Sequence, residues 1–161
     1  MRRVVPDNSV LVAAFYREEL ERDGKRVNLT ARAQPLLTAI LEGHVRAFAP
    51  YALLGEFLKV SRDKSSTRQG PSVITLEDAD AGVRDFLTLP IIFVPETELA
   101  ERAWELTRHH GLSPTDAWFL ACAEQQQADL WLSHWQKDGF AQAAQAVYER
   151  VFLLTDDAFR D

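Results

Sequence analysis

Short apolar runs of β-type residues alternate with longer helical patterns along this chain, and this alternation limits its fold more than any other feature. The β-type runs are RVVP, VRAFA, IIFV, LWLS and RVFLL, at residues 3–6, 45–49, 91–94, 130–133 and 150–154. Strands that alternate with helices typically form a parallel sheet covered by helices. The sequence therefore predicts an α/β fold with a central parallel sheet of four to five strands, flanked by helices on both faces.

The helical patterns between these runs begin and end at residues that favour helix boundaries. Asp23–Lys25 interrupts the first pattern, Gly43 and Gly111 end two others, and Thr75 is suited to cap a fourth. We expect helices over residues 10–22, 31–42, 51–62, 76–87, 96–110, 112–127 and 139–147.

The size and cysteine content of the chain narrow its class. With 161 residues, 47% of them hydrophobic, the sequence predicts one domain over residues 1–161. No apolar run is long enough to span a membrane, and Asp7 interrupts any export signal, so we expect neither. The single cysteine, Cys122, excludes an intramolecular disulfide and is expected in the core. These features favour a cytoplasmic location.

The charge balance and the missing motifs exclude several functions. A net charge of −6 argues against binding nucleic acid through a broad basic face, but not against an acidic metal centre with local basic residues. The sequence contains no GxxxxGK[ST] phosphate loop, no GxGxxG after a strand and no GxSxG elbow. The sequence therefore lacks the usual motifs of nucleotide-binding folds and of serine hydrolases.

Two carboxylates in the first part of the chain occupy notable positions. Asp7 directly follows the first predicted strand, and ligands gather at the carboxyl ends of strands in open α/β sheets. It is equally suited to cap the next helix, with Ser9 as a rival cap. Glu56 borders the apolar stripe of its predicted helix beside Val60, a position where a glutamate is ordinarily solvated.

Asp116 stands out more clearly, in the stretch LSPTDAWFLACA. Ser113 is suited to be an N-cap with Pro114 at the first helical position, so the Asp116 carboxylate would reach back to the helix start. The following run, residues 117–123, is apolar on nearly every side and indicates a buried helix. A carboxylate aimed into such surroundings needs a compensating partner. We expect Asp116 both to cap the helix and to belong to a site.

A fourth acid follows the strand predicted at residues 130–133. Asp138 is the preferred candidate, although Lys137-Asp138-Gly139 is also ordinary turn chemistry. Asp156 and Asp157 follow the last strand and are the alternative source of this acid.

Taken in order, these motifs resemble the PIN-domain ribonucleases, and among them the VapC-type toxins of toxin–antitoxin pairs. The resemblance covers nearly the whole chain and rests on VVPDNS, LLGEFLKV, SPTDAWFLACA and LWLSHWQKDGF, which hold Asp7, Glu56, Asp116 and Asp138. Two features depart from the family pattern. Trp135 stands where members often have Asn or Asp, and Gly139 separates Asp138 from Phe140.

The resemblance implies a PIN-like fold and hydrolysis of RNA phosphodiester bonds with Mg²⁺ or Mn²⁺. In this reading Asp7, Glu56, Asp116 and Asp138 are the catalytic, metal-holding acids, and Ser9 and Ser133 support them. Such hard cations prefer oxygen ligands, activate water and stabilise a leaving oxygen.

The resemblance and the local charges also suggest partners. Candidate RNA-binding residues are Arg62, Lys64 and Arg68, with Lys25 and Arg26 as further candidates. The resemblance implies a homodimer and a small antitoxin protein, which we expect in a groove between helices near Leu11, Phe15 and Leu54.

Two other functions compete with the ribonuclease reading. A non-catalytic PIN-like binding or scaffold module is favoured by Trp135 and the acidic charge. A Mg²⁺-dependent phosphatase with Asp7 as nucleophile is weaker, since the chain lacks a DxD motif after its first strand.

Overall fold

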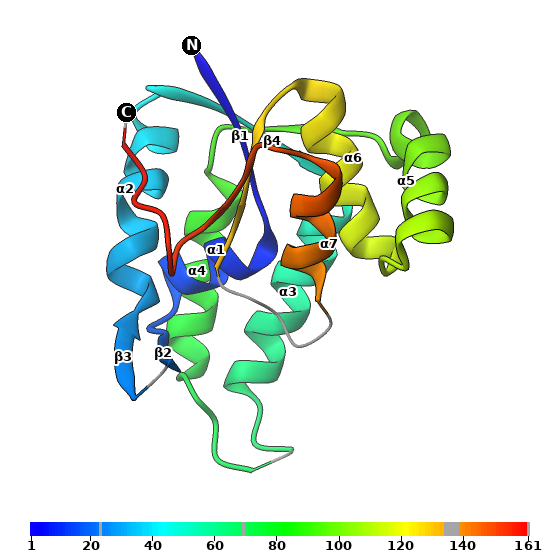
Figure 1. The fold of residues 1–161 in the computed structure, drawn as a ribbon. Coiled ribbons are helices and arrows are strands. Elements are labelled where there is room, and N and C mark those ends of the chain that lie inside the picture. Colours follow the sequence, from blue (N-terminus) through cyan, green and yellow to red (C-terminus); the bar gives the residue numbers. More distant parts are fainter. Residues whose placement is uncertain (23, 69, 134–138, 161) are drawn as a thin grey trace.

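A computed structural model describes residues 1–22, 24–68, 70–133 and 139–160 (Figure 1). Within these residues, five strands form one parallel sheet in the order β5-β4-β1-β6-β7. The strands are β1 (Arg2–Pro6), β4 (Val45–Pro50), β5 (Ile91–Val94), β6 (Asp129–Leu132) and β7 (Val151–Leu153). The predicted α/β class and parallel sheet are confirmed.

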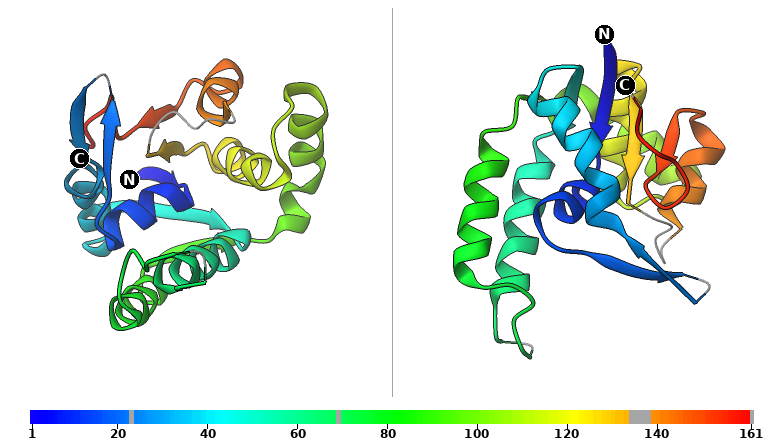
Figure 2. Two further views of the ribbon diagram at one scale, coloured as in Figure 1. Left: turned by 90° about the horizontal axis from the view of Figure 1, so that it is seen from below. Right: turned by 90° about the vertical axis from the view of Figure 1, so that its left-hand side faces the viewer.

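The helices cover both faces of this sheet. They are α1 (Asn8–Phe15), α2 (Leu29–Leu41), α3 (Ala52–Ser65), α4 (Leu76–Leu87), α5 (Glu96–His110), α6 (Pro114–Gln126) and α7 (Phe140–Val147). In Figure 2, left, α1 and α2 lie on one side of the strands, and α6 lies on the other with α5 packed outside it. None of the helices among the described residues has the length and apolar character needed to cross a bilayer.

The centre of the sheet is the most apolar part of the molecule. Val4 and Val5 of β1 are fully buried, and the four residues of β6 are buried as well. On one face they meet α6, whose Cys122 is completely inaccessible, as the sequence predicted. Burial of this thiol raises its pKa to about 12. Apolar strands at the centre and helices on both faces are the expected arrangement for a parallel sheet.

The register of the central strands places the start of α1 beside the end of β6. Pro6 of β1 pairs with Trp131 of β6, and the amide of Asp7 donates to the carbonyl of Trp131 at 2.9 Å. The carboxyl ends of β1 and β6 therefore lie side by side, at the lower end of β1 in Figure 1.

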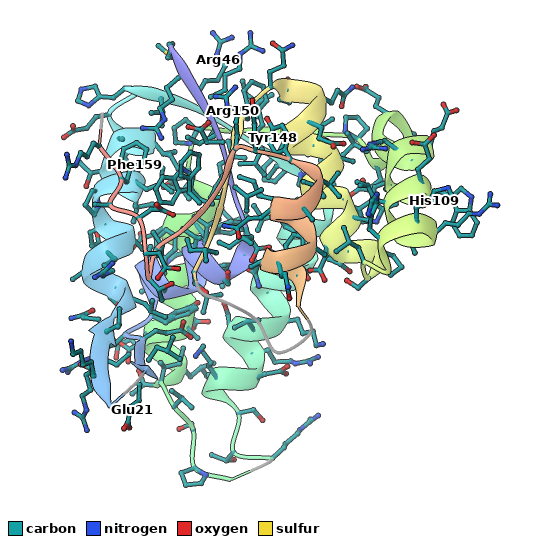
Figure 3. The ribbon with its side chains drawn as sticks, viewed as in Figure 1. Glu21, Arg46, His109, Tyr148, Arg150 and Phe159 are labelled. Carbon is teal, nitrogen blue, oxygen red and sulfur yellow. The ribbon has the colours of Figure 1, made fainter. Side chains whose placement is uncertain are left out.

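The opposite, amino end of the sheet holds a buried ion cluster. The Asp129 carboxylate, 6% exposed, accepts hydrogen bonds from Nε of Arg2 at 2.6 Å and Nε of Arg150 at 2.7 Å. The Arg2 guanidinium also lies 4.9 Å from the centre of the Phe159 ring. Arg150 is labelled at this end in Figure 3. We call Asp129, Arg2 and Arg150 the arginine-paired cluster.

The first predicted helix, over residues 10–22, is wrong in its second half. Helix α1 ends at Phe15, and the chain continues into an antiparallel hairpin of β2 (Glu19–Arg22) and β3 (Lys25–Asn28). Tyr16 leaves the helix in an extended conformation, and its ring stacks on Phe57 with centroids 5.7 Å apart. Leu20 and Val27 pair across the hairpin and pack against the core, which outweighs the local helical preference.

The other predicted elements agree with the structure to within a few residues. Helices α4 and α5 have the predicted bounds, and Thr75 caps α4 through a capping box with Asp78. Gly111 ends α5 in the left-handed conformation, at φ 66°. That turn carries the chain into Ser113, the N-cap of α6.

Candidate active site

A pocket of about 480 Å³ opens at the carboxyl ends of the central strands, where three helices begin or pass. We call it the acidic pocket. Its lining comes from the β1–α1 junction, α1, the segment before β2 (Glu19–Arg22), α3, the start of α6 and the end of β6. It consists of Asp7, Asn8, Ser9, Val12, Glu18, Glu56, Val60, Lys64, Ser113, Thr115, Asp116 and Ser133. Three of the four predicted acids and both predicted serines therefore meet in one place.

Asp7 is held at the N-terminus of α1. Its Oδ2 accepts hydrogen bonds from the Ser9 amide at 3.1 Å and the Ser9 hydroxyl at 2.6 Å, and only 6% of the residue is exposed. The Ser9 Oγ in turn accepts from the amide of Ser133 at 3.2 Å. Asp7 is thus the N-cap of α1 and also lines the pocket, so the two roles weighed from the sequence coexist in geometry.

Glu56 reaches the same pocket from α3 and is half-buried. Its pKa is raised to about 7, first by burial and then by the negative charges of Asp7 and Asp116, while Lys59 acts in the opposite direction. Carboxylates that raise the pKa of a neighbour lie close enough for their charges to interact. Glu56 therefore senses both other acids of the acidic pocket.

Asp116 lies at the third position of α6, as the sequence predicted. The Ser113 hydroxyl donates to Asp116 Oδ2 at 2.7 Å, and Ser113 Oγ accepts from the Asp116 amide at 3.1 Å. The side chain is half-buried and lines the acidic pocket, while the rest of the helix enters the core. The geometry thus combines a helix cap with a carboxylate at the site.

The fourth predicted acid is not placed in the same way. Asp138 lies outside the described residues. Asp156 and Asp157 follow β7, where the Asp157 carboxylate accepts from the amide of Leu153 at 2.9 Å, and neither residue lines the acidic pocket. Asp157 serves the turn after β7, which weakens the alternative assignment.

The predicted basic residues separate into two groups. Lys64 lines the acidic pocket and pairs with Glu18, whose Oε1 lies 2.8 Å from the lysine Nζ. Arg62 and Arg68 line a different hollow, and Arg62 is exposed and bonded to the adjacent Asp63. Among these three cations, Lys64 is the one positioned at the acids.

The predicted lining of an antitoxin groove, near Leu11, Phe15 and Leu54, is partly wrong. Leu11 is 1% exposed and belongs to the core, so it cannot line a surface groove. Phe15 and Leu54 are partly buried against the same core. Every residue of α1 from Val10 to Ala14 is buried, because that helix packs on α2, α3 and the sheet.

Several pocket residues were not identified as candidates from the sequence, among them Asn8 and Glu18. Asn8 lies between Asp7 and Ser9, and its Oδ1 is buried with no hydrogen-bond partner among the described residues. The sequence did not indicate Glu18 as a site residue, because this residue fell inside the helix predicted over residues 10–22. The signal available for Asn8 was its position in the D-N-S motif, directly after a strand.

The oxygen atoms of the acidic pocket suit a hard divalent cation in their chemistry. Carboxylates of Asp7, Glu56 and Asp116 and the unpartnered oxygen of Asn8 are the donor types that Mg²⁺ and Mn²⁺ prefer. As the described residues stand, no three His, Cys, Asp or Glu side chains are grouped tightly enough to hold a metal ion directly. Mg²⁺ commonly uses one or two carboxylates and keeps several waters, so the residues fit a partly hydrated ion.

Comparison with known proteins assigns the family. No curated protein matches the chain. The family model described as the PIN domain matches residues 4–133, a stretch that includes Asp7, Glu56, Asp116 and Ser133 and ends before Asp138. PIN domains are generally nucleases, and these nucleases typically use divalent metals. Since the match covers well over half of the sequence, the chain belongs to the PIN domain family.

Proposed function

We propose that this chain is a metal-dependent endoribonuclease that hydrolyses RNA phosphodiester bonds with Mg²⁺ or Mn²⁺. Asp7, Glu56 and Asp116 are its proposed catalytic carboxylates, and Asp138 is the proposed fourth. The general nuclease character of PIN domains supports the reaction class.

One observation carries this proposal. Asp7, Glu56 and Asp116 come from three separate elements and line one pocket. Burial raises the pKa of Glu56, and the charges of the two aspartates raise it further. Like charges gathered at a pocket destabilise the empty site and favour a bound cation.

The residues of the chain position the reacting groups. Ser9 holds Asp7, and Ser113 holds Asp116, so each carboxylate has a fixed orientation toward the pocket. A divalent cation bound there would lower the pKa of a water molecule and neutralise charge on the leaving oxygen. The fixed carboxylates of Asp7 and Asp116 would hold such a cation in place, which would favour a single orientation of the water toward the phosphate.

The biological setting is proposed from the resemblance to VapC-type toxins. In this setting the chain is the toxin of a type II toxin–antitoxin pair, works in the cytoplasm, forms a homodimer and is inhibited by a small antitoxin. Co-purification of a protein encoded by a neighbouring gene, together with loss of RNA cleavage in that complex, would support this setting.

The direct test is cleavage of single-stranded RNA with Mg²⁺ or Mn²⁺ by the parent chain and by Asp116→Asn. We expect Asp116→Asn to lose cleavage. Asp80→Asn, on the exposed side of α4, is the matched control and should retain it. Equal cleavage by the parent and Asp116→Asn would remove Asp116 from the proposed machinery.

A non-catalytic PIN-like module is the second candidate. It is favoured by the absence, among the described residues, of three ligand-type side chains grouped to hold a metal ion. Calorimetric titration with Mn²⁺ separates the two proposals. Binding that Asp7→Asn abolishes would count against a metal-free scaffold, and no binding by the parent would count against the nuclease.

A further inference from the structure

The acidic pocket contains an ion pair as well as its three acids. Lys64 lies two turns after Glu56 on the same face of α3, with Val60 between them, and all three line the pocket. The Lys64 Nζ lies 2.8 Å from Glu18 Oε1, and the side chains are 20% and 24% exposed. A cationic side chain, Lys64, is thus present in a pocket dominated by negative charge, and it is paired with the Glu18 carboxylate.

Both partners of this pair are fixed through their backbones. The Glu18 amide donates to Thr30 Oγ1 at 2.9 Å, and its carbonyl accepts from the Leu29 amide at 3.1 Å. The Lys64 carbonyl accepts from the amides of Val73 at 2.8 Å and Ile74 at 3.2 Å. Neither main chain depends on the ion pair for its position, so the side chains are able to separate without moving the fold.

The distance along α3 determines what Lys64 is able to contact. Eight residues of helix separate it from Glu56, which corresponds to about 12 Å along the axis. A nucleic-acid strand carries a regular row of phosphates, so a strand whose reactive phosphate lies at the carboxylates places another phosphate farther along α3. An ammonium group binds such a phosphate as a compact point charge.

We propose that Lys64 binds a second phosphate of the strand whose reactive phosphate is held at the acids, and that the Glu18 carboxylate competes with this phosphate, pairing with Lys64 until the RNA strand displaces it. This inference rests on the proposed function, because it names how the same pocket holds its RNA. Glu18 then sets how tightly the strand is held. Lys64 is a binding residue and Glu18 tunes it, while neither takes part in the bond cleavage.

The two single variants have opposite expected effects on RNA binding. Glu18→Gln should tighten binding about threefold, since it releases Lys64, and Lys64→Met should weaken binding about fivefold. Binding is measured by fluorescence anisotropy of a labelled single-stranded RNA with Mg²⁺, in the Asp116→Asn background, which is expected not to cleave. Both substitutions break the same ion pair, so a structural role alone would move the affinity in the same direction in both.

Salt dependence and the double variant sharpen the test. Lys64→Met should reduce the slope of log affinity against log salt by about 0.7, the loss of one phosphate contact on a single strand. In the Lys64→Met background, Glu18→Gln should lose most of its threefold effect, because no ammonium group remains for which Glu18 and the phosphate compete. Arg46→Met and Glu149→Gln, exposed at the amino end of the sheet, are the charge-matched controls.

The outcomes separate this inference from the proposed function. If the parent cleaves RNA but Glu18→Gln and Lys64→Met both weaken binding, or the salt slope of Lys64→Met equals that of Arg46→Met, the inference is overturned and the nuclease stands. If the parent neither binds nor cleaves RNA, both fail. Opposite shifts with a reduced salt slope support the inference even if the metal requirement differs from the one proposed.

Discussion

The two ends of the sheet both hold buried carboxylates, and they treat the charge in opposite ways. At the amino end, Asp129 is enclosed by the guanidinium groups of Arg2 and Arg150. At the carboxyl end, serine hydroxyls hold Asp7 and Asp116. Burial and the negative charges of these two aspartates raise the pKa of Glu56. One acid is matched by fixed cations, while three acids face one another across a pocket.

This difference supports the proposed function, in which the carboxyl end carries the chemistry and the amino end contributes stability. In a buried ion pair with fixed partners, the charges compensate each other without any ligand. Removing one partner leaves an uncompensated charge and destabilises the folded protein. A cluster of like charges is a less stable arrangement in the folded chain, and it becomes favourable when a cation binds. Perturbed carboxylates in a pocket are a common mark of functional sites.

The largest expected contrast is in activity. Asp7→Asn should reduce RNA cleavage by about 100-fold or more, since it removes charge where the proposed metal and leaving group need it. Asp129→Asn should leave cleavage per folded molecule unchanged, because Asp129 lies at the other end of the sheet. Initial cleavage rates, normalised to the folded fraction from circular dichroism, provide the measurement. Equal losses in both variants would end the distinction between the two regions.

The acidic pocket should make stability fall as pH rises. The pKa of Glu56 is about 7 in the folded chain, against 4.5 for an ordinary glutamate. Between these values the folded state holds more protons, so this group lowers the free energy of unfolding as pH rises from 4.5 through 7. The full shift corresponds to about 3 kcal/mol, and because the side chain is partly exposed and screened by water we expect about 2 kcal/mol.

Glu56→Gln isolates that effect. It should be more stable than the parent at pH 8 in EDTA, and the two should converge near pH 4, where Glu56 is protonated in both states. Urea unfolding at both pH values measures the difference. If the free energies of unfolding of the parent and Glu56→Gln differ by the same amount at pH 4 and pH 8, the raised pKa is contradicted.

The arginine-paired cluster should show the reverse behaviour on substitution. Asp129→Asn leaves two guanidinium groups without their carboxylate, and a cost of about 2 kcal/mol is expected because Arg2 and Arg150 retain partial access to water. Urea unfolding at pH 7 measures it, with Glu149→Gln as the exposed control nearby. A loss no greater than that of the control would show that the cluster adds nothing to stability.

The smallest predicted effect concerns the hydroxyl that holds Asp7. Ser9→Ala removes the donor to Asp7 and the acceptor for the Ser133 amide, which should cost about 1 kcal/mol. Thr88→Ala, whose hydroxyl bonds to a carbonyl on an exposed turn, should cost less. Thermal unfolding of both variants ranks these losses of stability. A larger loss for Thr88→Ala would mean that the Ser9 hydrogen bonds contribute little to stability.

Much of this fold could be predicted because its signals are local. Each strand of the parallel sheet is a short apolar run, and helices such as α4 and α5 have capping residues or a glycine at their ends. Asp7 and Asp116 were identifiable because a carboxylate directly after a strand or at a helix start has a predictable position in an α/β sheet.

The parts that could not be predicted depend on contacts between distant segments. The stretch Arg17–Arg22 has strong helix formers, and only the packing of Leu20 and Val27 against the core turns it into a hairpin. Because Glu18 lies at the start of that hairpin, its pairing with Lys64 was also hidden. The pKa of Glu56 depends on Asp7 and Asp116, which are far from it in the chain.

The buried thiol of Cys122 gives the molecule an internal reporter. It is the single cysteine of the chain, it is fully enclosed in α6, and burial raises its pKa to about 12. A thiol reagent therefore labels the protein only when this helix separates from the sheet, and the labelling rate measures how often that opening occurs. Because Asp116 lies in the first turn of α6, a cation that stabilises the acidic pocket should slow the labelling of a sulfur atom in the core.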